Sequence, residues 1–174
     1  MYRFRFVVVM FRCLASRPIR LTAERTLSFR AMPVFDIDVG RMFTHSYGRF
    51  TELGRWHLMF GSDFRALALK NRWTPVTTSE VIRYRRSVRS LQKIDVRTRV
   101  VHWDDRRFYI SHVITCNGLV VATSLVDGVI RGPSGILRPS EAFSAAGIDE
   151  TPVPASVEIL AQVRALQTFN AEVL

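Results

Sequence analysis

Two carboxylates, Asp36 and Asp38, are the side chains of this sequence that could most clearly take part in a reaction. They flank Ile37 between a segment of alternating apolar residues and a run with helical spacing that starts near Ser46. The first turn of a helix has free backbone N–H groups and the positive end of the helix dipole, so it stabilises negative charge. A carboxylate beside such donors suits chemistry in which negative charge develops on a bound group. An aspartate before a helix is also a common cap or turn former, and the residue types alone leave both interpretations open.

Two further side chains near this junction are candidates for chemistry. Glu52 lies within the helical run, one turn before Trp56, and would be a candidate base if it faced a pocket. The structural alternative, which we favour, is an exposed glutamate that pairs with Arg49 or Arg55. His45 is near the expected helix start and could hydrogen-bond a substrate, although a histidine at such a position is usually a solvated residue.

Other kinds of site are not indicated. His57, His102 and His112 have no metal-ligand spacing with one another or with Cys13 and Cys116. The two cysteines are isolated, which argues against a disulfide framework and favours a reducing compartment. The sequence also has no Ser-His-Asp set, Walker loop or G-x-G-x-x-G run. We therefore expect neither a metal nor a redox cofactor.

The elements that must position the candidate residues begin with a strand and a helix. Residues 25–35 partly alternate apolar and polar side chains, as a half-buried strand does. Residues 47–60 carry apolar side chains at three- and four-residue spacing, which predicts an amphipathic helix. Thr44 or Ser46 is the expected cap of this helix, and Gly61 is expected to end it.

Four extended segments follow a short helical piece at 63–71. They are rich in Val, Ile, Thr and Tyr and occupy residues 76–84, 93–103, 107–115 and 119–130. The pairs Asp104-Asp105 and Asn117-Gly118 are hairpin signals, so the last three segments must form an antiparallel meander. A final helix is expected at 155–169.

This order of elements fits an α+β domain in which a curved antiparallel sheet wraps around one central helix. At 174 residues the chain suits one domain with a sizeable core. Over residues 25–147 the sequence resembles the hotdog-fold acyl-CoA thioesterase superfamily, in its 4-hydroxybenzoyl-CoA-thioesterase-like branch. The resemblance rests on four runs: Phe35-Asp36-Ile37-Asp38; Tyr47 with Glu52-Leu53-Gly54-Arg55-Trp56; Ile82-Arg83-Tyr84-Arg85-Arg86; and His102-Trp103-Asp104-Asp105-Arg106-Arg107-Phe108-Tyr109-Ile110.

The resemblance implies roles for individual residues. The family's catalytic carboxylate is the second acid of a D-x-D motif, here Asp38, and acts as nucleophile or general base on a thioester. Backbone N–H groups at the start of the central helix, here near Thr44 and His45, would polarise the thioester carbonyl. Asp36 would be structural, and Tyr47 would contact the substrate.

This chain departs from the family pattern between the acid and the tyrosine. Many relatives have a His-Met-Asn-Asn-type run there, whereas this chain has Arg41-Met42-Phe43-Thr44. The spacing from the aspartate to Tyr47 is also one residue shorter.

The chain is strongly basic, with a formal net charge of +10 at pH 7, which favours acidic partners such as phosphates, nucleic acid or anionic lipid. A dense cluster of arginines at 83–89 has three interpretations. Arg83, Arg85 and Arg86 could clamp the phosphates of coenzyme A, follow a nucleic-acid backbone with Tyr84 stacked on a base, or form a solvated strand end. Because relatives in the family carry a similar run, nucleic acid is the least favoured partner.

The N-terminal segment combines arginines with apolar residues. Residues 1–23 contain five arginines and no acid, around an apolar run at 7–11 that is too short to span a bilayer. One interpretation is a helix that packs on the domain. The others are a mitochondrial-type presequence, a weak secretory signal and an amphipathic membrane-surface helix.

We therefore expect a basic N-terminal arm at 1–24, a hotdog domain at 25–147 and a helical extension at 148–174. The expected function is hydrolysis of a fatty or aromatic acyl-CoA by a homodimer or a dimer of dimers. The expected location is the cytoplasm, with contact to an anionic membrane surface as a further option and the mitochondrion as the alternative.

The alternative function is a catalytically silent hotdog, used as a binding or scaffold subunit at a membrane or in a large basic assembly. The altered run at 41–44 and the basic N-terminus favour this alternative. The retained Asp36-Ile37-Asp38 favours the enzyme.

Overall fold

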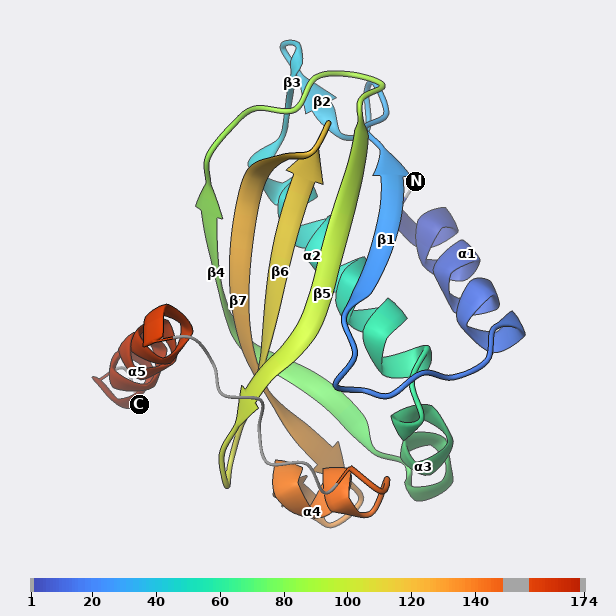
Figure 1. Ribbon diagram of the computed structural model, residues 1–174, viewed down its shortest axis with the longest axis vertical. Helices are drawn as coiled ribbons and strands as arrows, with labels where there is room; N and C mark the ends of the chain where they lie inside the picture. Colours follow the sequence, from blue (N-terminus) through green and yellow to red (C-terminus); the bar gives the residue numbers. More distant parts are fainter. Residues whose placement is uncertain (1, 149–156, 173–174) are drawn as a thin grey trace.

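One antiparallel sheet curls around one long helix, as Figure 1 shows. The computed structural model describes residues 2–148 and 157–172, with side chains of the last helix through residue 168. The helix is α2 (Thr44–Phe60). The strands, in their order across the sheet, are β1 (Arg25–Arg30), β5 (Lys93–Trp103), β6 (Phe108–Cys116), β7 (Leu119–Gly132) and β4 (Thr74–Tyr84), and the short β8 (Gly135–Leu137) pairs with β7. This arrangement confirms the expected α+β class and the curved sheet around a central helix.

The predicted meander is present as β5, β6 and β7. Between β6 and β7, Asn117 and Gly118 both have positive φ, at 50° and 77°, which is the geometry that an Asn-Gly hairpin favours. Between β5 and β6, the Asp104 carboxylate accepts the N–H groups of Arg106 and Arg107, each at 2.8 Å. Both predicted turns therefore form hairpins, and each is stabilised by its own residue types.

The core lies between α2 and the inner face of the sheet. Phe50, Leu53 and Leu58 of α2 are almost completely buried, and alternate residues of β6 face them across the core. The helix approaches the sheet closely at Gly54, where a Cβ atom would lie 2.5 Å from the Thr98 hydroxyl oxygen. A glycine at this position therefore allows the helix to sit this deep in the sheet.

Other helices cover the periphery of the sheet and of α2. The helices α3 (Phe64–Asn71) and α4 (Pro139–Ser144) lie near the lower end of the sheet in Figure 1. The last helix, α5 (Val157–Glu172), packs Val163 and Leu166 against Tyr109 of β6. Tyr109 alternates with core residues along β6, so α5 covers the outer face of the sheet. The expected start of this helix, Ala155, lies outside the described residues.

The N-terminal segment forms the helix α1 (Tyr2–Ala15), which packs along α2 beside β1 (Figure 1). Val9 and Cys13 are buried in this contact. The interpretation of this segment as a helix that packs on the domain therefore holds for one face of α1. Among the described helices, none is long and apolar enough to cross a membrane.

Two local predictions near the D-x-D motif are wrong. The first strand ends at Arg30 rather than near residue 35, because Val34 takes a left-handed φ of 69° and Asp36 closes a turn onto Met32. Neither Thr44 nor Ser46 caps α2. The cap position is Phe43, whose side chain makes no capping hydrogen bond.

The free edge of β4 leads to a prediction about assembly. Within the described residues, β4 is the last strand of the sheet and its outer edge has no partner strand. Unpaired edge groups favour pairing with another strand, and a twofold pair would satisfy both copies. We expect sedimentation at micromolar concentration to give twice the mass of one chain, or a multiple of that, with slow deuterium exchange along β4. A monomer whose β4 amides exchange freely would contradict this prediction.

Candidate active site

The D-x-D motif lies on a small hairpin that sequence reasoning did not predict. The strands β2 (Ile37–Asp38) and β3 (Arg41–Met42) pair antiparallel, with Asp38 opposite Arg41. The turn between them has positive φ at Val39 (43°) and Gly40 (77°). A β-branched residue rarely adopts this conformation, so Val39 holds a strained turn directly after Asp38.

Backbone hydrogen bonds attach this hairpin to the start of α2. The carbonyl oxygen of Asp36 accepts the Phe43 N–H at 2.9 Å and the Ser46 hydroxyl at 3.4 Å. Phe43 directly precedes the first residue of α2. The motif and the helix start therefore form one local unit.

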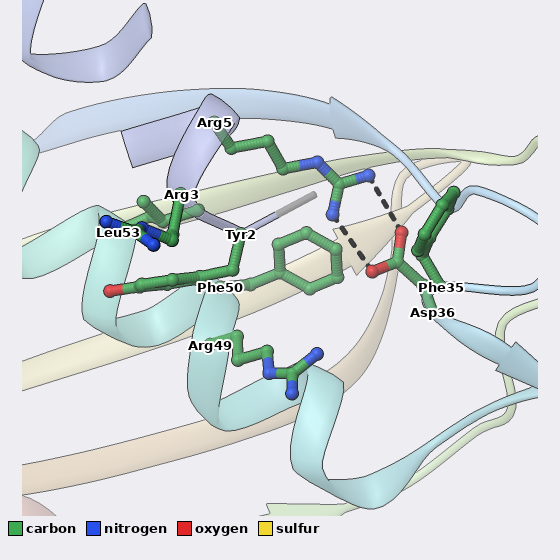
Figure 2. A pocket seen from close by; sticks show the side chains of 8 residues that line it. All are labelled: Tyr2, Arg3, Arg5, Phe35, Asp36, Arg49, Phe50 and Leu53. Atoms are coloured by element: carbon green, nitrogen blue, oxygen red, sulfur yellow. Dashed lines mark hydrogen bonds and ion pairs between the residues drawn. The ribbon is translucent and has the colours of Figure 1, made fainter. Parts of the chain in front are cut away.

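Asp36 has a structural role. The residue is 3% exposed, and both carboxylate oxygens accept from the Arg5 guanidinium of α1, at 2.9 and 2.8 Å. One of these oxygens also accepts the Met32 N–H at 2.8 Å. Figure 2 shows this two-pronged contact beside Phe50, whose ring lies 5.0 Å from the Arg5 guanidinium carbon. The carboxylate is thus fully engaged in holding α1 and the loop together.

Asp38 differs from Asp36 in its surroundings. It is exposed at the end of β2, next to the turn. Its carboxylate is therefore accessible from solvent, in contrast to the buried carboxylate two residues earlier. The structure separates the two acids of the motif into one structural and one accessible group.

The first turn of α2 begins with two exposed residues and has no capping side chain. Thr44 and His45 are both exposed in its first turn, and the Phe43 side chain does not cap it. The His45 ring stacks on Phe43 with their centroids 4.7 Å apart. No side chain of the cap residue therefore competes for the backbone N–H groups predicted to hold an oxyanion.

Tyr47 and the arginine cluster meet at the end of β4. Tyr47 is buried, its hydroxyl donates to the Arg86 carbonyl at 3.2 Å, and its ring contacts that of Tyr84. Arg83, Arg85 and Arg86 have exposed side chains. Tyr47 therefore positions the arginine cluster, and its substrate contact stays a prediction.

Glu52 faces a cavity between α2 and β4. This α2–β4 cavity has a volume of about 320 Å³. Its lining residues are Glu52, Arg55, Trp56, Met59, Thr74, Pro75, Val76, Thr77, Phe108 and Ile110. Glu52 also hydrogen-bonds Tyr2, and burial together with this bond raises the pKa of the Tyr2 hydroxyl. Arg55, one of the two arginines expected to pair with Glu52, pairs with Glu80 at 3.1 Å.

Glu80 is a polar centre that sequence reasoning missed. One of its carboxylate oxygens accepts from the hydroxyls of Thr51 (2.7 Å) and Ser124 (2.8 Å), and the other pairs with Arg55. This network joins α2 to β4 and β7 next to the α2–β4 cavity. Glu80 lies two residues before Ile82 in β4, so both side chains point to the same face of the sheet, and Ile82 packs against the core. An acid on the core-facing side of a strand was the sequence signal for this polar centre.

Two histidines are neutral: His112 lies in the core, and His57 is half-buried. His112 is completely buried with its Nδ1 atom 2.9 Å from the Thr98 hydroxyl, and burial lowers its pKa well below the usual value. Burial, with the charges of Arg25 and Arg12, lowers the pKa of His57 to about 4. Among the described residues, no group of histidine, cysteine and acidic side chains is arranged to hold a metal ion.

Comparisons with known sequences point to one family. The sequence pattern of the Thioesterase-like superfamily matches residues 33–157, which include the D-x-D hairpin and the whole sheet except β1. Protein THEM6 of Danio rerio is 34% identical over 145 residues, which cover 79% of this chain and 70% of that protein.

Solved structures share the fold. The probable thioesterase YbaW from Escherichia coli has a TM-score of 0.63 at 20% identity, with 72% of this chain and 96% of YbaW covered. The hypothetical protein SAV2348 from Staphylococcus aureus, solved in complex with CoA, has a TM-score of 0.64 at 14% identity, with 79% and 91% covered. The curled sheet around α2 is thus the hotdog fold that the sequence resemblance predicted. Together with the match over residues 33–157, this establishes that the chain belongs to the Thioesterase-like superfamily.

Proposed function

We propose that this chain hydrolyses the thioester of an acyl-CoA, with Asp38 as the reacting carboxylate. The observation that carries the proposal is the attachment of the D-x-D hairpin to the uncapped start of α2. Asp38 either removes a proton from a water that attacks the thioester carbonyl, or attacks that carbonyl itself. In the second route the C–S bond breaks, the thiolate of coenzyme A leaves, and water then hydrolyses the acyl-aspartyl anhydride. The N–H groups near Thr44 and His45 hold the oxyanion that forms, and the products are a carboxylic acid and the free thiol of coenzyme A.

The α2–β4 cavity is the place where the acyl group of the substrate would be buried. Trp56, Met59, Phe108 and Ile110 give its lining a mainly apolar character, which suits a fatty or aromatic chain. The cavity borders the free edge of β4, so a second copy paired along β4 would help to enclose it. Glu52 is the alternative base, because it is the acid among the lining residues.

The arginine cluster supports coenzyme A as the carrier of that acyl group. The backbone N–H groups of Arg85 and Arg86 both donate to the Val121 carbonyl, at 2.8 and 3.1 Å. The main chain is therefore held while the side chains of Arg83, Arg85 and Arg86 remain exposed. Guanidinium groups match phosphate oxygens, and the relative solved in complex with CoA agrees with such a ligand.

A second candidate is a hotdog domain that binds an acyl-CoA without turnover. Asp38 is absent from the described lining of the α2–β4 cavity, whereas Glu52 is present. This separation, with Arg41-Met42-Phe43-Thr44 in place of the family's usual run, favours the silent binding or scaffold subunit.

A panel of acyl-CoA esters distinguishes the two candidates. The purified chain is incubated with aromatic esters and with saturated esters of increasing length, and the released thiol is followed with a chromogenic disulfide. The enzyme predicts thiol release above the protein-free rate for at least one class of ester. Binding of an ester, measured by calorimetry, without any thiol release would establish the silent binder instead.

A further inference from the structure

The helix α1 has a second apolar face that the domain does not cover. Phe4, Val7, Phe11 and Leu14 are 66%, 63%, 72% and 65% exposed. Their spacing of three, four and three residues places them within an arc of about 80° on the helix, at 3.6 residues per turn. We call these four side chains the outer stripe of α1. The opposite face, with Val9 and Cys13, is the one buried against the domain.

Exposed cations accompany the outer stripe. Arg3 and Arg12 flank the stripe on its two sides around the helix axis, and Arg17 follows the end of α1; all three are exposed. Residues 1–23 contain no acidic side chain. Within this segment, the exposed side of α1 is therefore apolar in the middle and positively charged around it.

The charge decides what covers this face. A second copy docked stripe to stripe would bring the same arginines together, and like charges without acids between them repel. An anionic lipid surface offers hydrocarbon for Phe4 and Phe11 and phosphate groups for the arginines. The charge pattern thus complements anionic lipid and opposes self-association.

The dimensions fit a helix that lies in the plane of the membrane surface. The 14 residues of α1 extend about 21 Å at 1.5 Å per residue, which is less than the roughly 30 Å of bilayer hydrocarbon. One face is also fixed to α2, so the helix cannot leave the domain to insert across the bilayer without losing that contact. Only the outer stripe is available for contact with lipid. An interfacial helix likewise lies in the membrane plane and buries one apolar face.

We propose that α1 docks this protein on anionic membrane surfaces through the outer stripe, with Arg3, Arg12 and Arg17 beside the lipid phosphates. The helix stays packed on the domain and carries Arg5 on its inner side, where Arg5 holds Asp36. Docking therefore fixes the orientation of the D-x-D hairpin relative to the bilayer. It leaves the β4 edge free, because α1 lies beside β1 and β4 is at the other edge of the sheet (Figure 1).

The test is sedimentation of the full chain with vesicles. One set contains equal parts of phosphatidylcholine and phosphatidylserine, and the other contains phosphatidylcholine alone. The chain is expected to bind the first set and not the second. Val7→Asp with Phe11→Asp should lower the affinity more than about tenfold by removing apolar contacts. Replacing Arg3, Arg12 and Arg17 by glutamine should lower it on the order of 100-fold, about fivefold for each arginine.

A matched control separates this effect from general damage. Leu119→Asp with Ile136→Asp changes two apolar residues that are also exposed, at 53% and 67%, on β7 and β8. It adds the same charge and should leave vesicle binding unchanged. Both double variants should keep the thermal midpoint of the parent, because every changed side chain is exposed.

Several results would overturn the proposal. The proposal fails if the parent does not bind anionic vesicles, or binds neutral vesicles equally well. It also fails if the Val7→Asp, Phe11→Asp variant binds anionic vesicles as the parent does. Self-association of the parent that this variant abolishes, without vesicle binding, would assign the stripe to a second copy. The proposal does not depend on thioester hydrolysis, so an inactive protein that binds anionic vesicles would still support it.

Discussion

Asp38→Asn is expected to lower the rate of thioester hydrolysis by about 10²- to 10⁴-fold, the usual contribution of a general base. The amide has the shape of the carboxylate but cannot accept the proton or attack the carbonyl. Asp38 is exposed at the hairpin, so the substitution should leave the thermal midpoint unchanged. The measurement is the initial rate of thiol release on the most reactive ester of the panel.

Two further variants make this prediction specific. Asp105→Asn changes another exposed aspartate, in the β5–β6 turn, and should retain the parent rate. Glu52→Gln tests the acid that lines the α2–β4 cavity. A parent-like rate for Asp38→Asn combined with a large loss for Glu52→Gln would move the reacting carboxylate from the hairpin to the cavity.

Asp36→Asn is expected to lower the free energy of unfolding by about 3–5 kcal/mol, the cost of breaking a buried ion pair. The side chains of Arg5 and Asp36 are 12% and 4% exposed. The substitution leaves the guanidinium without its charged partner and weakens the acceptor of the Met32 N–H. Urea unfolding followed by circular dichroism measures the change.

The surface pair between Arg138 and Glu141 provides the control. Its side chains are 67% and 64% exposed, so Glu141→Gln should cost less than about 1 kcal/mol. Asp36→Asn should also change the free energy of unfolding more than it changes the activation free energy of thioester hydrolysis by the folded protein. Equal and small costs for Asp36→Asn and Glu141→Gln would show that the contact with Arg5 does not hold α1 on the domain.

The architecture could be predicted because its signals are local. The turn pairs Asp104-Asp105 and Asn117-Gly118 lie between segments rich in β-branched residues, so they determined the meander directly. The three- and four-residue spacing in 47–60 likewise identified the central helix. Once these elements were placed, one curved sheet around one helix followed.

The site was harder to predict because its contacts are distant in sequence. Arg5 and Asp36 are 31 residues apart, and Thr51 and Glu80 are 29 residues apart. No periodicity reveals such pairs. The two-residue strands of the β2–β3 hairpin are also too short to show alternation. The assignment of Asp38 therefore came from the family resemblance, whereas the structural role of Asp36 is visible in its contacts.

The second face of α1 also could not be derived from composition. The apolar run at 7–11 indicated an apolar helix, but both a packed and an exposed face are apolar in this segment. Which side chains are exposed depends on the angle at which α1 lies on α2. Only the packed structure separates the outer stripe from Val9 and Cys13.

The most direct test of the proposed hydrolysis is the number of thiol groups released per chain under excess acyl-CoA. Parent protein and Asp38→Asn are compared on the same ester, with calorimetric binding of that ester measured in parallel. The proposal predicts many thiols per parent chain, far fewer for Asp38→Asn, and similar binding by both. Binding by the parent with no more thiol than in the protein-free control would contradict it and identify the chain as a silent binding subunit.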